Sequence, residues 1–96
     1  HFDCGDGWFV LLRDLSDKIE AFNRTADGDQ HVVATQVKEK FGGLRFYVDH
    51  HCDEVEGPIA DAEEKSFEIC EECGGVGTLR EGNWLRTLCD DCHHKK

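Results

Sequence analysis

Cys70-Glu71-Glu72-Cys73 and, after fifteen intervening residues, Cys89-Asp90-Asp91-Cys92 are the two segments that decide this fold. Two Cys-x-x-Cys pairs at this separation are typical of a zinc site, because each pair presents two thiolates and the intervening loop can fold back. Four thiolates complete a tetrahedron around one ion and leave no open coordination position. The sequence therefore predicts one structural Zn²⁺ ion held by Cys70, Cys73, Cys89 and Cys92.

The same cysteines have two other interpretations. The pairs could be redox Cys-x-x-Cys motifs, or the four thiols could form two disulfides. Neither pair has the strand-to-helix surroundings of a redox motif, so zinc is favoured. Gly74 and Gly75 follow the first pair, where the backbone must turn tightly and can direct N–H groups at the sulfur atoms.

Size and charge limit the classes of function. A chain of 96 residues forms one small domain, for which a metal ion is a useful support. Its net charge of −10 argues against general nucleic-acid binding and suits a basic protein partner, or serves solubility alone. No run of eighteen apolar residues is present, so we expect no membrane-spanning helix. Paired reduced cysteines and the lack of a signal peptide predict a cytoplasmic protein.

The first half of the chain predicts a helix and a β-hairpin. Apolar residues recur every three or four positions over residues 8–23, which is typical of a helix with one buried face, and Asp6 is placed to cap it. Segment 31–41 is rich in β-branched residues, and segment 44–49 alternates apolar and polar ones. Gly42-Gly43 between them suits a two-residue hairpin turn.

An acidic helix is expected next, after a loop over residues 49–57. Pro58 suits the first turn of a helix that extends to residue 69. Between Asp53 and Glu72 the chain carries nine carboxylates and the single cation Lys65. We expect four acidic residues spaced three or four apart to share one exposed edge, which is the candidate partner surface: Asp61, Glu64, Glu68 and Glu71. A solvated face without a partner is the alternative.

Residues 70–96 predict a small zinc module. Segments 78–80 and 84–88 form a hairpin turned by residues 81–83, and a helix begins at Cys89. This order of knuckle, hairpin and helix resembles the treble-clef family, which includes GATA-type fingers and the HNH endonuclease scaffold. The whole chain is thus expected to be one α+β domain: helix and β-hairpin in 1–57, acidic helix in 58–69, and a treble-clef-like zinc ribbon in 70–96.

A second resemblance spans nearly the whole chain. Gly5-Asp6-Gly7-Trp8-Phe9, Gln36-Val37-Lys38-Glu39-Lys40-Phe41-Gly42-Gly43-Leu44-Arg45-Phe46-Tyr47 and Trp84-Leu85-Arg86-Thr87-Leu88-Cys89 look like segments of a family of small uncharacterised bacterial and phage proteins. The resemblance implies a prokaryotic or viral cytosolic origin. By analogy with small acidic phage proteins that occupy the nucleic-acid groove of a host enzyme, it also suggests an accessory or inhibitor role.

Enzymatic activity is the less favoured class. The end of the chain, residues 88–96, resembles the close of an HNH nuclease, which needs a further His on the hairpin and usually ligands for a second metal. Residues 74–88 contain neither His nor Asp, so a degenerate HNH-type nuclease is the third interpretation and no catalytic residue is assigned.

A nucleic-acid-associated zinc finger is the second interpretation. It would use a local patch of cations and aromatic residues: Lys38, Lys40, Arg45, Arg80 and Arg86, with Tyr47 and Trp84. These cations are more simply solvated residues whose stems cover apolar surface. The favoured function is therefore a non-enzymatic, zinc-stabilised interaction module whose partner has a basic surface.

A further group of residues could bind metal without showing a fixed ligand spacing. It consists of His1, Cys4, His50, His51 and Cys52, all in expected loops. Exposed loop side chains are the favoured interpretation, and a second zinc site stays open.

Overall fold

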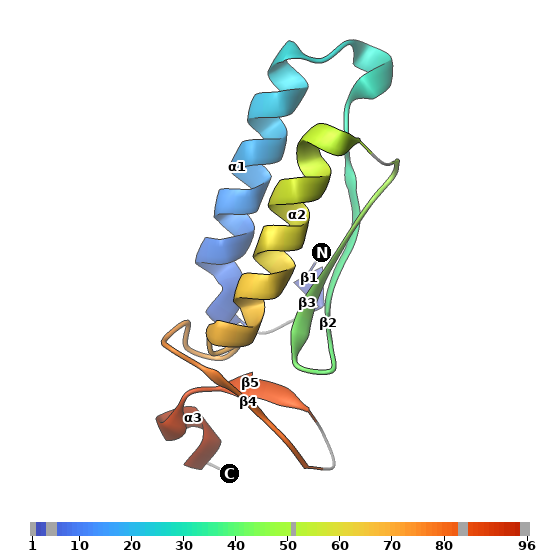
Figure 1. The fold of residues 1–96 in the computed structure, drawn as a ribbon. Coiled ribbons are helices and arrows are strands. Elements are labelled where there is room, and N and C mark those ends of the chain that lie inside the picture. The colour runs from blue at the N-terminus through green and yellow to red at the C-terminus, as the bar shows by residue number, and fades with distance from the viewer. Residues whose placement is uncertain (1, 4–5, 51, 83–84, 95–96) are drawn as a thin grey trace.

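Two helices lie side by side against a three-stranded sheet, and a small cysteine-containing module closes one end of this assembly (Figure 1). The computed structural model describes residues 2–3, 6–50, 52–82 and 85–94. The expected α+β order of helix, β-hairpin, helix and C-terminal cysteine module is confirmed.

The first helix, α1, covers Phe9–Thr25 and buries one apolar stripe, as the sequence predicts. A 3-10 turn, η1 (Asp6–Trp8), precedes it, so Trp8 occupies the cap position and the expected cap at Asp6 is wrong. Contacts from distant residues determine this start. The Gly7 N–H donates to the Glu71 carbonyl at 2.8 Å, and the fully buried Trp8 indole donates to the Ile69 carbonyl at 2.9 Å.

The sheet consists of three strands in the order β1-β2-β3. A 3-10 turn, η2 (Gly28–Gln30), leads from α1 towards β2 (Ala34–Lys40), which pairs antiparallel with β3 (Gly43–Val48). The register shifts between Ala34 and Gln36, an irregularity that the sequence did not indicate. The short β1 (Phe2–Asp3), parallel to β2, was not expected either.

The hairpin turn lies one residue earlier than expected. Phe41 and Gly42 form it with φ angles of 56° and 83°, and Gly43 already pairs with Lys40. A turn with two positive φ angles matches the twist of the flanking strands. Glycine is needed at position 43 for a different reason, because a β-carbon there would overlap the ring of Phe67.

The second helix, α2, covers Asp53–Lys65 and begins five residues before Pro58, so the expected loop over residues 49–57 is wrong in its second half. The Cys52 carbonyl accepts the first helical bonds, from the N–H groups of Val55 at 3.1 Å and Glu56 at 3.0 Å. Acidic residues in the first turn stabilise the positive end of the helix. A 3-10 turn, η3 (Ser66–Glu68), replaces the last turn of the expected helix.

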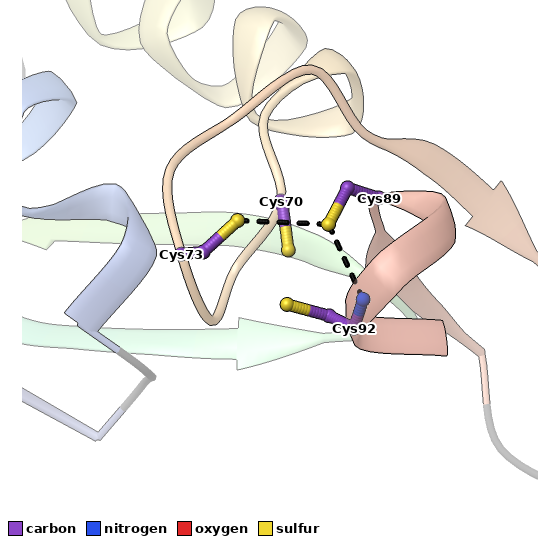
Figure 2. Close-up of side chains that lie close together, drawn as sticks. All are labelled: Cys70, Cys73, Cys89 and Cys92. Carbon is purple, nitrogen blue, oxygen red and sulfur yellow. Dashed lines mark hydrogen bonds between the residues drawn. The ribbon is translucent and has the colours of Figure 1, made fainter. Parts of the chain in front are cut away.

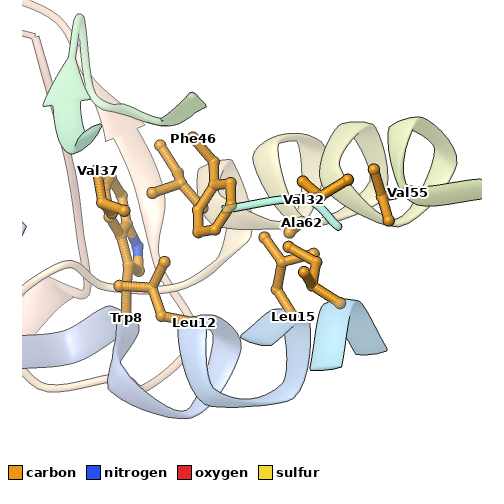
Figure 3. Packing of buried hydrophobic residues seen from close by; sticks show 10 residues of the cluster. Trp8, Leu12, Leu15, Val32, Val37, Phe46, Val55 and Ala62 are labelled. Atoms are coloured by element: carbon orange, nitrogen blue, oxygen red, sulfur yellow. The ribbon is translucent and has the colours of Figure 1, made fainter. Parts of the chain in front are cut away.

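The main core lies between the two helices and the inner face of the sheet. Figure 3 shows Trp8, Leu12 and Leu15 facing Val37 and Phe46. The buried cluster includes ten residues: Trp8, Leu12, Leu15, Ile19, Val32, Val37, Leu44, Phe46, Val55 and Ala62. Each large apolar side chain buried in this way contributes about 1.5–3 kcal/mol.

The end of α2 is also bonded to the outer strand of the hairpin. The Leu44 N–H donates to the Ser66 hydroxyl at 2.8 Å, and the Phe46 N–H donates to the Glu63 carboxylate at 3.0 Å. These bonds fix η3, from which the chain enters the cysteine module. That module contains β4 (Thr78–Arg80), β5 (Arg86–Leu88) and the short helix α3 (Asp90–His94).

Candidate metal centre

Four sulfur atoms converge between two elements of the module (Figure 2). Cys70 and Cys73 lie on a knuckle loop after η3, Cys89 directly precedes α3, and Cys92 lies within α3. All four Sγ atoms are within 4.8 Å of one another, and those of Cys73 and Cys89 are 3.6 Å apart. A Zn–S bond of about 2.3 Å in a tetrahedron requires sulfur atoms roughly 3.8 Å apart. The cluster therefore fits one tetrahedral metal ion.

The knuckle backbone has the geometry that this site needs. The Cys70 N–H donates to the Gly75 carbonyl at 2.7 Å, while Gly74, with a φ of 82°, returns its N–H to the Cys70 carbonyl at 2.9 Å. The expectation of N–H groups directed at sulfur is confirmed for Gly75, which donates to Cys73 Sγ at 3.4 Å, and not for Gly74. In α3, the Cys92 N–H donates to Cys89 Sγ at 3.3 Å. Such bonds favour the thiolate form that binds metal.

The environments of the four thiols differ. Burial alone would raise the pKa of Cys70, but hydrogen bonds from the N–H groups of Cys89, Cys73 and Glu72 lower it to about 6. The pKa of Cys92 is raised to about 12, chiefly because its thiol is hydrogen-bonded to the sulfur of Cys89, and burial adds to the shift. None of the five described cysteines forms a disulfide. The donor set is therefore four thiols, which suits a soft divalent ion.

A buried ion pair links the knuckle to β5. Glu71 retains only 5% of its exposure, and its carboxylate accepts hydrogen bonds from Arg86 Nε at 2.9 Å and from the Thr87 N–H at 3.2 Å. Arg86 also donates to the more exposed Glu72 at 2.9 Å. The expectation that Glu71 belongs to an exposed acidic edge is therefore wrong, because the chain leaves the helix at Lys65 and turns Glu71 into the module.

The second arginine of the module hairpin is also bound internally. Arg80 donates to the Leu88 carbonyl at 3.1 Å and to Asp90 at 2.7 Å. The candidate basic patch is thus divided: Arg80 and Arg86 serve the module, whereas Lys38, Lys40 and Arg45 lie on the hairpin of the main sheet. Trp84, the remaining member, lies outside the described residues.

The module packs closely on the rest of the chain, through residues that the sequence analysis did not select. A β-carbon at Gly7 would overlap the Cys70 carbonyl oxygen, so only glycine allows η1 to approach the knuckle. The buried Thr87 hydroxyl donates to the Gly42 carbonyl at 2.6 Å and joins β5 to the main hairpin turn. The signal for these contacts in the sequence is glycine at both contact points, Gly7 and Gly42. Glycine at these positions also fits ordinary turns.

The remaining residues of the expected acidic edge are exposed, and one of them lines a hollow. Asp61 and Glu64 are exposed on α2 and Glu68 is exposed on η3. Asp61 also lines a hollow of about 490 Å³ between α1 and α2, next to the knuckle. Its apolar lining includes Phe9, Val10, Leu11, Pro58 and Ile69.

Of the other potential metal ligands, the two that the structure describes contact an acidic neighbour instead of each other. His50 Nδ1 lies 3.0 Å from an Asp49 oxygen, and the Cys52 thiol donates to Glu54 at 2.8 Å. His1, Cys4 and His51 lie outside the described residues. In the part of the chain that the structure describes, the four cysteines form the only cluster of three or more metal-ligating side chains.

Comparison with known proteins did not find a relative. No protein-family model, curated protein or solved structure matches the chain. Over the described residues, no helix has both the length and the apolar character needed to cross a membrane.

Proposed function

We propose that this protein is a non-enzymatic, zinc-stabilised interaction module that binds a protein partner with a basic surface. The observation that carries this proposal is the hollow of about 490 Å³ between α1 and α2, because it combines an apolar wall with acidic surroundings beside the metal centre. A cytoplasmic location is part of the proposal, since it keeps the four thiols reduced.

The metal's part in this function is structural. Cys70, Cys73, Cys89 and Cys92 would occupy all four positions of a Zn²⁺ ion, whose contribution when bound is to fix the geometry of the module. Cys73 and Gly74 of the knuckle also line the hollow. A fixed knuckle therefore preserves one wall of the binding surface, and metal binding and partner binding should be coupled.

The apolar wall supplies an anchor point. Phe9 and Val10 remain 61% and 56% exposed on the first turn of α1, although both are apolar. Leu11 and Pro58 continue this wall across to α2. A hollow of this kind accepts one or two apolar side chains of a partner, whose burial supplies most of the affinity.

The charge around the hollow selects the partner. Asp6, Asp14 and Asp61 line it together with two lysines, Lys18 and Lys65. The acidic side chains of Glu64 and Glu68 extend the negative surface beyond it. A partner that presents Arg or Lys around an apolar anchor fits this surface, and the net charge of −10 accelerates its approach. Basic grooves of nucleic-acid-processing enzymes belong to this class of surface.

A designed peptide tests the surface directly. The probe is a labelled amphipathic helix with a leucine stripe flanked by lysines, and its control has glutamates in place of the lysines. Association with the zinc-loaded protein is measured by stopped-flow fluorescence at two salt concentrations. We expect Glu64→Lys with Glu68→Lys to slow association of the lysine peptide several-fold and to weaken its salt dependence.

The matched control carries Asp17→Lys with Glu20→Lys, which changes the net charge equally on the exposed side of α1. This control should affect association less. We also expect Val10→Ser to accelerate dissociation, because it removes apolar contact in the hollow. Equal effects of the two charge-reversal pairs, or binding of the glutamate peptide as tight as that of the lysine peptide, would contradict the proposed surface.

A further inference from the structure

The face of the main sheet that points away from the helices differs in charge from the rest of the chain. Val37, Leu44 and Phe46 point to the core, so the alternate positions point outward. Cross-strand pairs place Lys38 opposite Arg45. Among the outward positions of β2 and β3 between residues 36 and 47, all of them described, none is acidic: Gln36, Lys38, Lys40, Gly43, Arg45 and Tyr47.

Two aromatic rings stand on or beside this face with a cation at each of them. Tyr47 is 42% exposed, and the Lys38 ammonium lies 5.7 Å from the centre of its ring. Phe41, in the hairpin turn, is 62% exposed, and the Lys40 ammonium lies 5.6 Å from its ring. Each ring has a cation over one face and remains partly exposed, so it offers a base a stacking surface and its phosphate a counter-charge.

We infer that this sheet face, defined by Lys38, Lys40, Phe41, Arg45 and Tyr47, binds single-stranded nucleic acid. The Tyr47 and Lys40 ends of the face are four residues apart along the strands, roughly 13 Å at the usual strand rise. This length accommodates about two stacked bases, one for each ring. A flat face of this kind stacks unpaired bases and does not enter a duplex groove, so a single strand is the ligand that fits.

Two described carboxylates near this face are bound by backbone N–H groups. The Glu39 carboxylate accepts the Gly42 N–H at 2.7 Å and is thereby held at the turn. The Asp49 carboxylate, directly after β3, accepts the Val33 N–H at 3.0 Å. Helices α1 and α2, which carry many of the carboxylates of the chain, lie on the other side of the sheet (Figure 1). Screening over about 10 Å at 0.1 M salt separates the two regions. The expectation drawn from net charge alone is therefore revised for this face.

An acidic protein segment or the acidic face of a second copy would satisfy the same cations. Neither uses the two exposed rings, which is why a nucleic-acid strand is favoured. The test measures fluorescence anisotropy of a labelled 12-nucleotide single strand of mixed sequence with the zinc-loaded protein. With three phosphates neutralised, raising salt from 50 to 200 mM should weaken binding roughly 20-fold.

Variants then separate stacking from charge. Tyr47→Ala should weaken binding by about 5- to 150-fold, and Tyr47→Phe should restore most of it, since it keeps the ring. Lys38→Ala with Arg45→Ala should weaken binding and reduce the salt dependence. The matched control, Arg13→Ala with Arg24→Ala, removes two exposed cations from α1 and should leave binding unchanged. Thermal unfolding of each variant shows whether it remains folded.

Several results would overturn the inference. The first is no binding at 50 mM salt. Tighter binding of a matched duplex, or of a polyglutamate peptide, would show that the face does not read single strands. Equal losses of affinity in Lys38→Ala with Arg45→Ala and in the control Arg13→Ala with Arg24→Ala would show that the strand does not bind at the sheet face. A dimer, seen by sedimentation, that Lys38→Ala with Arg45→Ala dissolves while strand binding persists would assign the face to self-association instead.

Discussion

Glu71 and Glu72 allow a direct test of how the module is held together. Both carboxylates accept a hydrogen bond from Arg86 at 2.9 Å, yet the Glu71 side chain is 7% exposed and that of Glu72 is 41% exposed. The pKa of Arg86 is raised, chiefly by its hydrogen bond with Glu71. We predict that Glu71→Ala destabilises the protein strongly, whereas Glu72→Ala does so weakly.

The magnitude follows from the groups that each change leaves behind. Glu71→Ala strips the acceptor from the buried Thr87 N–H, which costs about 1–3 kcal/mol. It also breaks a charged hydrogen bond to Arg86, which we discount to about 1 kcal/mol because Arg86 is 22% exposed and keeps Glu72. The sum is about 3 kcal/mol in the free energy of unfolding. Glu72→Ala removes one exposed pair, and the expected loss is about 0.5 kcal/mol.

Urea unfolding of the zinc-loaded protein, followed by circular dichroism, measures both changes. Glu71→Gln provides a further comparison, because it keeps an acceptor for Thr87 while removing the charge, and it should fall between the two alanine variants. If Glu71→Ala and Glu72→Ala lower the free energy of unfolding equally, burial is not what distinguishes them, and the reasoning is refuted.

Three further predictions concern the metal, the contact with η1 and acid stability. The protein should bind one zinc per chain and lose its cooperative unfolding on chelation, and Cys70→Ser should be as damaging as Cys92→Ser. Metal analysis and circular dichroism measure these effects. A metal-free sample that still unfolds cooperatively would contradict the prediction. Gly7→Ala should destabilise the protein by about 2 kcal/mol or more because its β-carbon meets backbone, whereas Gly28→Ala, with open space around it, should stay within about 1 kcal/mol of the parent in the same urea titration. The pKa of Asp49 is lowered below 3.8, first by the hydrogen bond from the Val33 N–H and also by His50, so its contribution to stability is present above pH 3.8 and is lost as pH falls through the lowered value. Asp49→Asn should therefore flatten the acid side of the pH–stability curve, and an unchanged slope would show that Asp49 does not contribute to it.

Local patterns in the sequence were sufficient for the main elements and for the convergence of the four cysteines. The spacing of the four cysteines predicts their convergence because a thiolate site is built from short-range geometry that the spacing encodes. The three- and four-residue periodicity over 8–23 likewise reports one buried face of α1, which the structure confirms.

The errors arose where a distant contact competes with a local signal. Pro58 suits a first helical turn, yet α2 gains an earlier turn from Val55, which is buried in the core. Helical spacing predicted that the row of acidic residues continues to Glu71. The helix ends at Lys65, however, and the Glu71 carboxylate instead accepts a hydrogen bond from Arg86 inside the module. Neither the burial of Val55 nor the partner of Glu71 is encoded in the neighbouring residues.

The bonds from Leu44 to Ser66 and from Phe46 to Glu63 have a consequence for aggregation. β3 is an edge strand, and edge strands with free N–H groups are templates on which other chains can add. Here α2 and η3 cover two of those groups. Ser66 lies only four residues before Cys70, so a chain whose knuckle unravels after losing its metal also uncovers Leu44. The metal-free protein should therefore aggregate as well as be less ordered, and its aggregation should be faster at higher protein concentration.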